Sequence, residues 1–186
     1  MKKYSGFPWF FKLNMIHKNT PLKEVLKLAA PCQCSSCNHG CKFGSGALAG
    51  DDSRKIAEFL KISEGELKNN FLEEKEMFNK QVSRPRLIRE KNKLHGQCVF
   101  FDGKKGCTIH EVKPLECKTS IQCRDYGEDL SVWFMVNHIV DANDAESVRQ
   151  YSQYIKSGGK LIPGAELENL VPDKDKLKKI LRYEIF

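Results

Sequence analysis

Eight cysteines in two groups constrain this chain more than any other feature of its sequence. The first group is Cys32, Cys34, Cys37 and Cys41, and the second group is Cys98, Cys107, Cys117 and Cys123. Thiolates are soft ligands, and four of them suit tetrahedral zinc or an iron–sulfur cluster. The density of the first group favours a cluster, because an ordinary zinc site pairs two short knuckles from distant segments. We therefore predict that all eight are metal ligands that hold at least one [4Fe-4S]-type centre, with Zn²⁺ as the alternative.

The rest of the composition argues against a secreted fold held by disulfides. Of 186 residues, 40% are apolar and eleven are phenylalanine, so the chain can bury a core of its own. An apolar patch near the N-terminus is interrupted by Pro8 and Lys12 and no small-residue cleavage site follows, so we expect no signal peptide. No window approaches the roughly 20 apolar residues of a transmembrane span. We therefore expect a cytoplasmic protein, in which thiols stay reduced and can bind metal.

The hydrophobic pattern predicts a mostly α (α+β) fold, arranged as a single domain over residues 1–186. Within it, residues 31–123 form a cysteine-rich metal-binding region, and residues 124–186 form a helical C-terminal region. Two β-rich runs flank an Asp-Gly…Gly turn in residues 98–107, which predicts one small β-hairpin. Residues 130–140 are apolar on most sides, so we expect them to form a central buried helix.

Proline positions decide where we expect the first cysteine group. Thr20 followed by Pro21 is a favourable helix start, and Pro31 ends that helix. The first group is then predicted to lie in a loop, where glycines let the backbone curl closely around a metal centre.

Capping residues predict three further helices. Asp51 or Asp52 is expected to cap the first of them. Ser63 opens a capping box for the second, whose apolar stripe continues to Phe78. Asp144 caps the third.

Basic residues outnumber acidic ones by 31 to 24, and residues 80–93 are densely basic. We interpret this segment as a solvated linker, and the alternative is a surface that binds phosphates of nucleic acid or of a membrane. The partner is unknown, and the candidates are macromolecules, either nucleic acid or an acidic protein.

Three histidines lie near the cysteines and could replace a thiolate. His39 is inside the first group, and His95 and His110 flank parts of the second. His110 is the best placed, at the end of the predicted hairpin. A histidine beside cysteines is more often a hydrogen-bonding neighbour, so none of the three joins the predicted ligand set.

Two motifs in the second group carry a family resemblance. The sequences GQCVFFD at 96–102 and GCTIHEVKPLEC at 106–117, together with the dense first group, resemble the YkgJ-type cysteine cluster family. Its pattern is C-x-x-C-x(2–3)-C-C, then G-x-C-x-F-L, then C-x-I-Y-x-x-R-P-x-x-C. The resemblance implies zinc or iron chelation and ligand roles for Cys98, Cys107 and Cys117.

This chain departs from that pattern in several places. The first group has no adjacent cysteine pair, His110 stands in place of tyrosine, and Lys113 stands in place of arginine. Cys123 has no counterpart in the pattern. The family's relatives include a flagellin lysine N-methylase, so the resemblance also implies methyl transfer as a candidate activity.

Three functions remain open at this point, and whether the chain is an enzyme is open with them. The first is an iron–sulfur protein for electron transfer or for support of a modification of a partner macromolecule. The second is a zinc-stabilised module that binds nucleic acid or protein, and the third is a metal-dependent protein lysine N-methyltransferase. A radical-SAM loop is excluded, because it spaces its cysteines three and then two residues apart, the reverse of Cys34, Cys37 and Cys41.

Overall fold

Helices make up most of the regular structure, which confirms the predicted mostly α class. The computed structural model describes residues 16–29, 32, 34–124 and 126–184. In these residues the helices are α1 (Leu22–Leu28), α2 (Ser35–Phe43), α3 (Asp52–Leu60), α4 (Glu64–Phe71), α5 (Leu115–Thr119), α6 (Gly127–Phe134), α7 (Ala145–Lys156), α8 (Leu167–Leu170) and α9 (Lys174–Leu181).

The strands form three small antiparallel pairs in the described residues. They are β1 (Leu72–Met77) with β2 (Lys80–Pro85), β3 (Leu87–Ile88) with β4 (Gln97–Cys98), and β5 (Phe101–Asp102) with β6 (Gly106–Cys107). The predicted hairpin is the β5–β6 pair. The prediction of a single hairpin was wrong, because two further pairs precede it.

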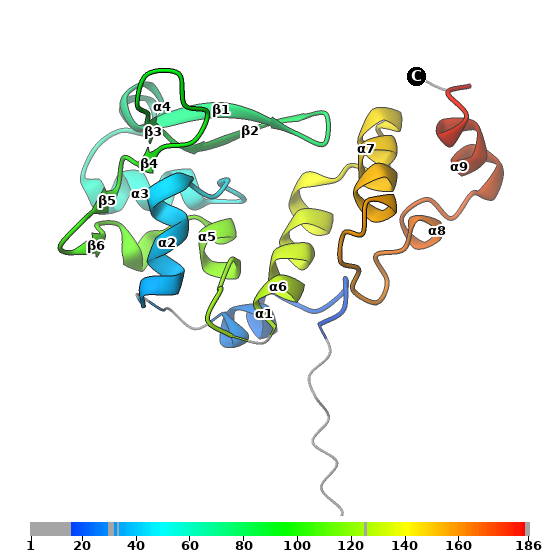
Figure 1. Cartoon of the computed structure of the whole chain (residues 1–186), viewed down its shortest axis with the longest axis horizontal. Coiled ribbons are helices and arrows are strands. Elements are labelled where there is room, and N and C mark those ends of the chain that lie inside the picture. The colour runs from blue at the N-terminus through cyan, green and yellow to red at the C-terminus, as the bar shows by residue number, and fades with distance from the viewer. Residues whose placement is uncertain (1–15, 30–31, 33, 125, 185–186) are drawn as a thin grey trace, which may run out of the picture.

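The cysteine-bearing elements gather at one end of the molecule. Figure 1 shows α2, α5 and β4–β6 together with α3, α4 and the β1–β2 ribbon, while α7, α8 and α9 lie at the other end and α6 lies between them. One core surrounds α6 and includes Trp133, Phe134 and Tyr151, and a second core under the cysteine-bearing elements includes Ile56 and Phe100. The predicted buried helix at 130–140 is confirmed, since α6 continues as a π-helical turn, Met135–Ile139.

Side-chain caps confirm two of the predicted helix starts. Ser63 Oγ accepts a hydrogen bond from the Glu66 amide at 3.1 Å, and Asp144 Oδ1 accepts one from the Ser147 amide at 2.6 Å. Asp51 takes the N-cap position of α3 but makes no capping hydrogen bond with its side chain.

The helix that begins after Ser63 is shorter than predicted. Its apolar stripe was expected to reach Phe78, yet α4 ends at Phe71 and the chain continues as β1. The pairing of β1 with β2 overrides the helical propensity of its glutamates. Phe78 lies in the turn, with φ of 50°, and its ring packs edge-on against Tyr151 with centroids 6.2 Å apart.

The turn of this ribbon contacts the C-terminal helices. Asn79 Nδ2 donates to both carboxylate oxygens of Asp144 at 3.1 Å, and Lys80 Nζ donates to the carbonyl of His138 at 2.8 Å. These bonds connect the turn of the β1–β2 ribbon to residues 138 and 144, which are distant from it in the sequence (Figure 1).

The basic segment at 80–93 is not a linker, which corrects our interpretation. It forms β2 and β3, and two of its arginines converge on Glu73 of β1. Arg84 Nη2 lies 2.8 Å and Arg89 Nη2 lies 2.6 Å from Glu73 Oε1, and all three side chains are largely shielded from solvent. The two guanidinium groups lower the pKa of Glu73 to about 2, with the hydrogen bond from Arg89 as the largest cause.

In the described part of the chain, no helix has the length and apolar character needed to cross a bilayer. The N-terminal apolar patch and Pro31 lie outside the described residues.

We predict that Glu73→Gln destabilises the fold by about 1–2 kcal/mol at neutral pH, because two arginines lose the anion that holds them together. The lowered pKa means that this stabilisation is present above the unfolded value near 4.3 and is lost as pH falls towards 2. Urea unfolding of the wild type and the variant, repeated down to acid pH, should therefore show a difference that shrinks below about pH 4. Glu76→Gln, on an exposed position of the same strand, is the matched control. If Glu73→Gln and Glu76→Gln lose equal free energy of unfolding, the stabilisation does not come from the ion pairs of Glu73.

Candidate metal centres

Helix α2 carries two of the cysteines, and few other contacts fix its position. We predicted a loop for the first group, but Cys37 and Cys41 lie in α2, one helical turn apart. The helix buries none of its residues, contains Gly40, and receives no side-chain hydrogen bond at its N-cap. Its last residue, Phe43, accepts a backbone hydrogen bond from the Gly96 amide at 3.4 Å and packs on His95, but no buried apolar face fixes the rest of the helix, so ligation of its two thiols is a candidate force.

The eight cysteines sort into two sets in space, and each set draws on both sequence groups. The outer set is Cys32, Cys34, Cys37 and Cys123. The inner set is Cys41, Cys98, Cys107 and Cys117, which line one cavity that Cys32 and Cys37 of the outer set also border. All eight are free thiols, so none is joined in a disulfide. Segments remote in the sequence therefore converge, and the sequence grouping does not predict which cysteines share a set.

The sulfurs of the outer set are in contact with one another. All four lie within 4.8 Å of each other. Cys37 Sγ lies 3.4 Å from Cys123 Sγ, and Cys123 Sγ lies 3.5 Å from Cys32 Sγ, both within hydrogen-bonding distance for sulfur. A tetrahedral zinc ion with Zn–S bonds near 2.3 Å holds its sulfurs about 3.8 Å apart. The outer set therefore has the size of a site for a single tetrahedral ion.

Hydrogen bonds shift the pKa values of the outer cysteines in opposite directions. A backbone hydrogen bond from Cys37, and then one from the Cys32 thiol, lower the pKa of Cys34 to about 6. Hydrogen bonds with Cys37 and Cys32 raise the pKa of Cys123 to about 12. Without a cation the set therefore shares protons among its sulfurs, and a bound metal ion would replace them.

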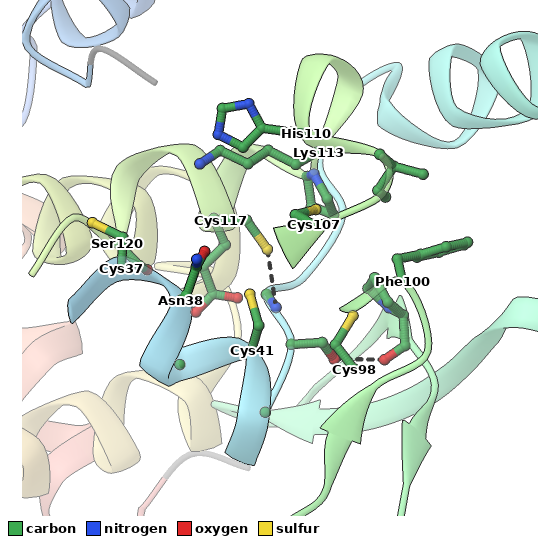
Figure 2. Close-up of a pocket in the computed structure, with 18 of the residues that line it drawn as sticks. Cys37, Asn38, Cys41, Cys98, Phe100, Cys107, His110, Lys113, Cys117 and Ser120 are labelled. Atoms are coloured by element: carbon green, nitrogen blue, oxygen red, sulfur yellow. Dashed lines mark hydrogen bonds between the residues drawn. The ribbon is translucent and has the colours of Figure 1, made fainter. Parts of the chain in front are cut away.

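Each cysteine of the inner set comes from a different element. Cys41 lies on α2, Cys98 on β4, Cys107 on β6 and Cys117 on α5. Figure 2 shows these four side chains pointing into one cavity, while the sulfur of Cys37 points away from them. The cavity has a volume of about 210 Å³.

The inner sulfurs stand apart from one another. In contrast to the outer set, none of these four described residues makes a sulfur–sulfur hydrogen bond, and their mutual influence is through charge. The four sulfurs of the inner set therefore surround a cavity, whereas the four sulfurs of the outer set are close enough to one another to bind a single ion.

Backbone contacts fix Cys117 against the loop that follows α2. The Gly46 amide donates to Cys117 Sγ at 3.3 Å, as Figure 2 shows by a dashed line, and the Ala47 amide donates to the Glu116 carboxylate. Asp52 is buried, and its Oδ2 accepts from the amides of Ala49 at 2.9 Å and of Leu115 at 2.8 Å. The loop and the start of α5 are thus held together by hydrogen bonds.

Burial keeps the inner thiols protonated when no cation is present. It raises the pKa of Cys98 to about 12 and raises the pKa values of Cys41, Cys107 and Cys117 as well. Hydrogen bonds from the backbone to three of these sulfurs act in the opposite direction, with a smaller effect. Four thiolates together in this cavity therefore require a positively charged centre.

Lys113 supplies one positive charge from the protein itself. It lines the cavity, and its ammonium group opposes the rise in the pKa values of Cys41 and Cys107. Its place in the Lys113-Pro114 pair of the family motif was the only sign of this role in the sequence.

The three candidate histidines have different surroundings. His39 and His95 are exposed and pack on either side of the Phe43 ring, with centroids 4.8 Å and 5.7 Å from it. His110 lines the cavity, and its Nε2 lies 3.4 Å from the carbonyl of Cys32. That contact makes His110 a neighbour of both sets.

Sequence reasoning did not single out two positioning residues, Gly46 and Asp52. A Cβ on Gly46 would lie 2.7 Å from Cys117 Sγ and 2.8 Å from the Cys117 nitrogen, so only glycine fits there. The GSG sequence at 44–46 was the available signal. Asp52 had been assigned to a helix cap, and its buried bonds reach across to α5 instead.

One family model matches this chain. It is described as a putative zinc- or iron-chelating domain, CxxCxxCC, and it covers residues 33–150. No curated protein and no solved structure matches the chain.

We predict that Gly46→Ala lowers the metal content of the inner set and destabilises the protein by about 1–3 kcal/mol, since the new methyl group overlaps Cys117. Metal analysis and thermal unfolding measure the two effects. Gly40→Ala is the control, because no atom lies within 4 Å of its added Cβ and alanine favours a helix. If Gly46→Ala and Gly40→Ala lose equal amounts of metal, the close contact between residue 46 and Cys117 is not the cause of the loss.

Removing metal should loosen α2 before the rest of the fold. We expect anaerobic chelation under reducing conditions to abolish the hydrogen-exchange protection of α2 amides, because the helix buries no side chain of its own. Helix α7 has a side-chain cap and buried residues, and it should keep its protection. An α2 that stays as protected as α7 in the metal-free protein would show that other forces hold it.

Proposed function

Because the chain belongs to the CxxCxxCC family of zinc- or iron-chelating domains, we propose that its inner set holds an iron–sulfur cluster. The cluster would serve electron transfer or support a modification of a partner macromolecule. Metal binding through clustered cysteines is the general activity of the chain, and the cluster is our specific proposal.

The observation that carries this proposal is the arrangement of the inner set around a cavity. Thiolates that bind different irons of one cluster stand further apart than thiolates that share one ion. Four thiols from four elements face about 210 Å³ of space without direct sulfur contacts. A group larger than a single ion fits that arrangement.

The residues around the cavity also suit an iron–sulfur group. When bound, such a cluster supplies one-electron chemistry, and its potential depends on hydrogen bonds to sulfur and on solvent access. Here the Gly46 amide donates to Cys117, and Phe100 and Ile109 are buried apolar residues of the lining. Lys113 adds a positive charge that offsets the charge of the thiolates.

Zinc in the inner set is the competing assignment. It would make the chain a zinc-stabilised module that contacts nucleic acid or an acidic protein through the basic segment. That surface has less free charge than the sequence indicates, because Arg84 and Arg89 both bind the carboxylate of Glu73. Lysine N-methyl transfer remains a prediction from the family resemblance, and no contact among residues 16–29, 32, 34–124 and 126–184 favours it.

Anaerobic purification tests the cluster. We expect a coloured protein with iron and acid-labile sulfide in equal amounts, and a paramagnetic signal after one-electron reduction or oxidation. Cys98→Ala should lose the colour and the iron, because Cys98 belongs to the inner set. Cys34→Ala, in the outer set, should keep both. A colourless wild-type protein that contains zinc and no iron would overturn the proposal.

A further inference from the structure

We propose that the outer set is a second and separate metal site, which binds one tetrahedral ion of the zinc type through Cys32, Cys34, Cys37 and Cys123. This site is independent of the group that occupies the inner set. It would act as a clamp that fixes the segment before α2 to the segment between α5 and α6.

The dimensions of the outer set carry the assignment. Its sulfur contacts of 3.4 Å and 3.5 Å, within a group no wider than 4.8 Å, are close to the spacing of about 3.8 Å expected around tetrahedral zinc. A polynuclear cluster has no room between sulfurs that already touch. Among the residues that the structure describes, this is the tightest gathering of metal-binding side chains.

The geometry of α2 separates the two sites. Cys37 and Cys41 are four residues apart on one helix, yet Cys41 joins the inner cysteines while the sulfur of Cys37 points away from them (Figure 2). One ion cannot bind both sets of four thiolates, since tetrahedral coordination is complete with four. The helix therefore contributes one ligand to each site.

The outer site explains what holds the flanking segments. Cys37 and Cys123 meet although 86 residues separate them, and α2 buries no side chain to stabilise that meeting. Closing so long a loop costs conformational entropy, and metal–thiolate bonds offset that cost. Cys123 is also exposed and has no counterpart in the family pattern, so the motif alone does not supply this fourth ligand.

Metal counting on single-cysteine variants tests the proposal. We expect wild-type protein, purified without oxygen, to contain about one zinc per chain besides the metal of the inner set. Cys123→Ser should lose that zinc and keep the inner metal, while Cys98→Ser should lose the inner metal and keep one zinc. If the inner set binds zinc instead of a cluster, the wild type should contain about two zinc ions and each variant should lose one. Failure of the iron–sulfur proposal is thereby distinguished from failure of this one.

Cobalt substitution keeps the test decisive if Cys123→Ser does not fold. Cys98→Ser protein loaded with Co²⁺ should show the strong visible bands of a tetrahedral thiolate site, with circular dichroism to confirm that it is folded. The Cys98→Ser, Cys123→Ser double variant is the control and should show no such bands. The proposal is overturned if folded Cys98→Ser binds no Co²⁺, or if wild-type protein contains metal for one site alone.

Discussion

The position of α2 is the constraint on which both candidate sites depend. An amphipathic helix normally docks through a buried apolar face, and α2 has no buried residue. Its two cysteines instead face different neighbours, Cys123 on one side and the inner thiols on the other. Bonds from metal to thiolate are strong enough to order a helix of this kind, so under our proposal we expect folding of this region to be coupled to metal binding.

A second layer of contacts adapts the protein to the inner set. Asp52 binds the amide of Leu115 and thereby fixes the start of α5, and Gly46 approaches so closely that its amide reaches Cys117. These residues bind no metal in our assignment. They place Cys117 against the cavity and keep its sulfur hydrogen-bonded, which is how surrounding groups orient a ligand and tune its centre.

Sequence patterns predicted the helix at residues 130–140 and the caps at Ser63 and Asp144, because each of these depends on local chemistry, whereas ligation by the eight cysteines stays a prediction. They did not predict which cysteines pair. That partition follows from α2 being helical, and a segment with Gly40, Ser35, Ser36 and Asn38 has low helical propensity. The segment of β1 was predicted to be helical for a similar reason. Its strand pairs with a distant partner, in which Arg84 lies opposite Glu73 and binds it.

The C-terminal helices connect to the inner set through the β1–β2 ribbon. At its turn, Asn79 binds the carboxylate that caps α7. Further along, the carbonyl of Ser83 accepts from the Leu48 amide at 2.9 Å, and that of Pro85 accepts from Ser45 Oγ at 2.5 Å. The ribbon therefore lies between α7 and the loop that holds Cys117. The same ribbon is thus held at its turn by the residue that caps α7 and at its other end by the loop that contacts Cys117, so both ends of the molecule contribute to its position.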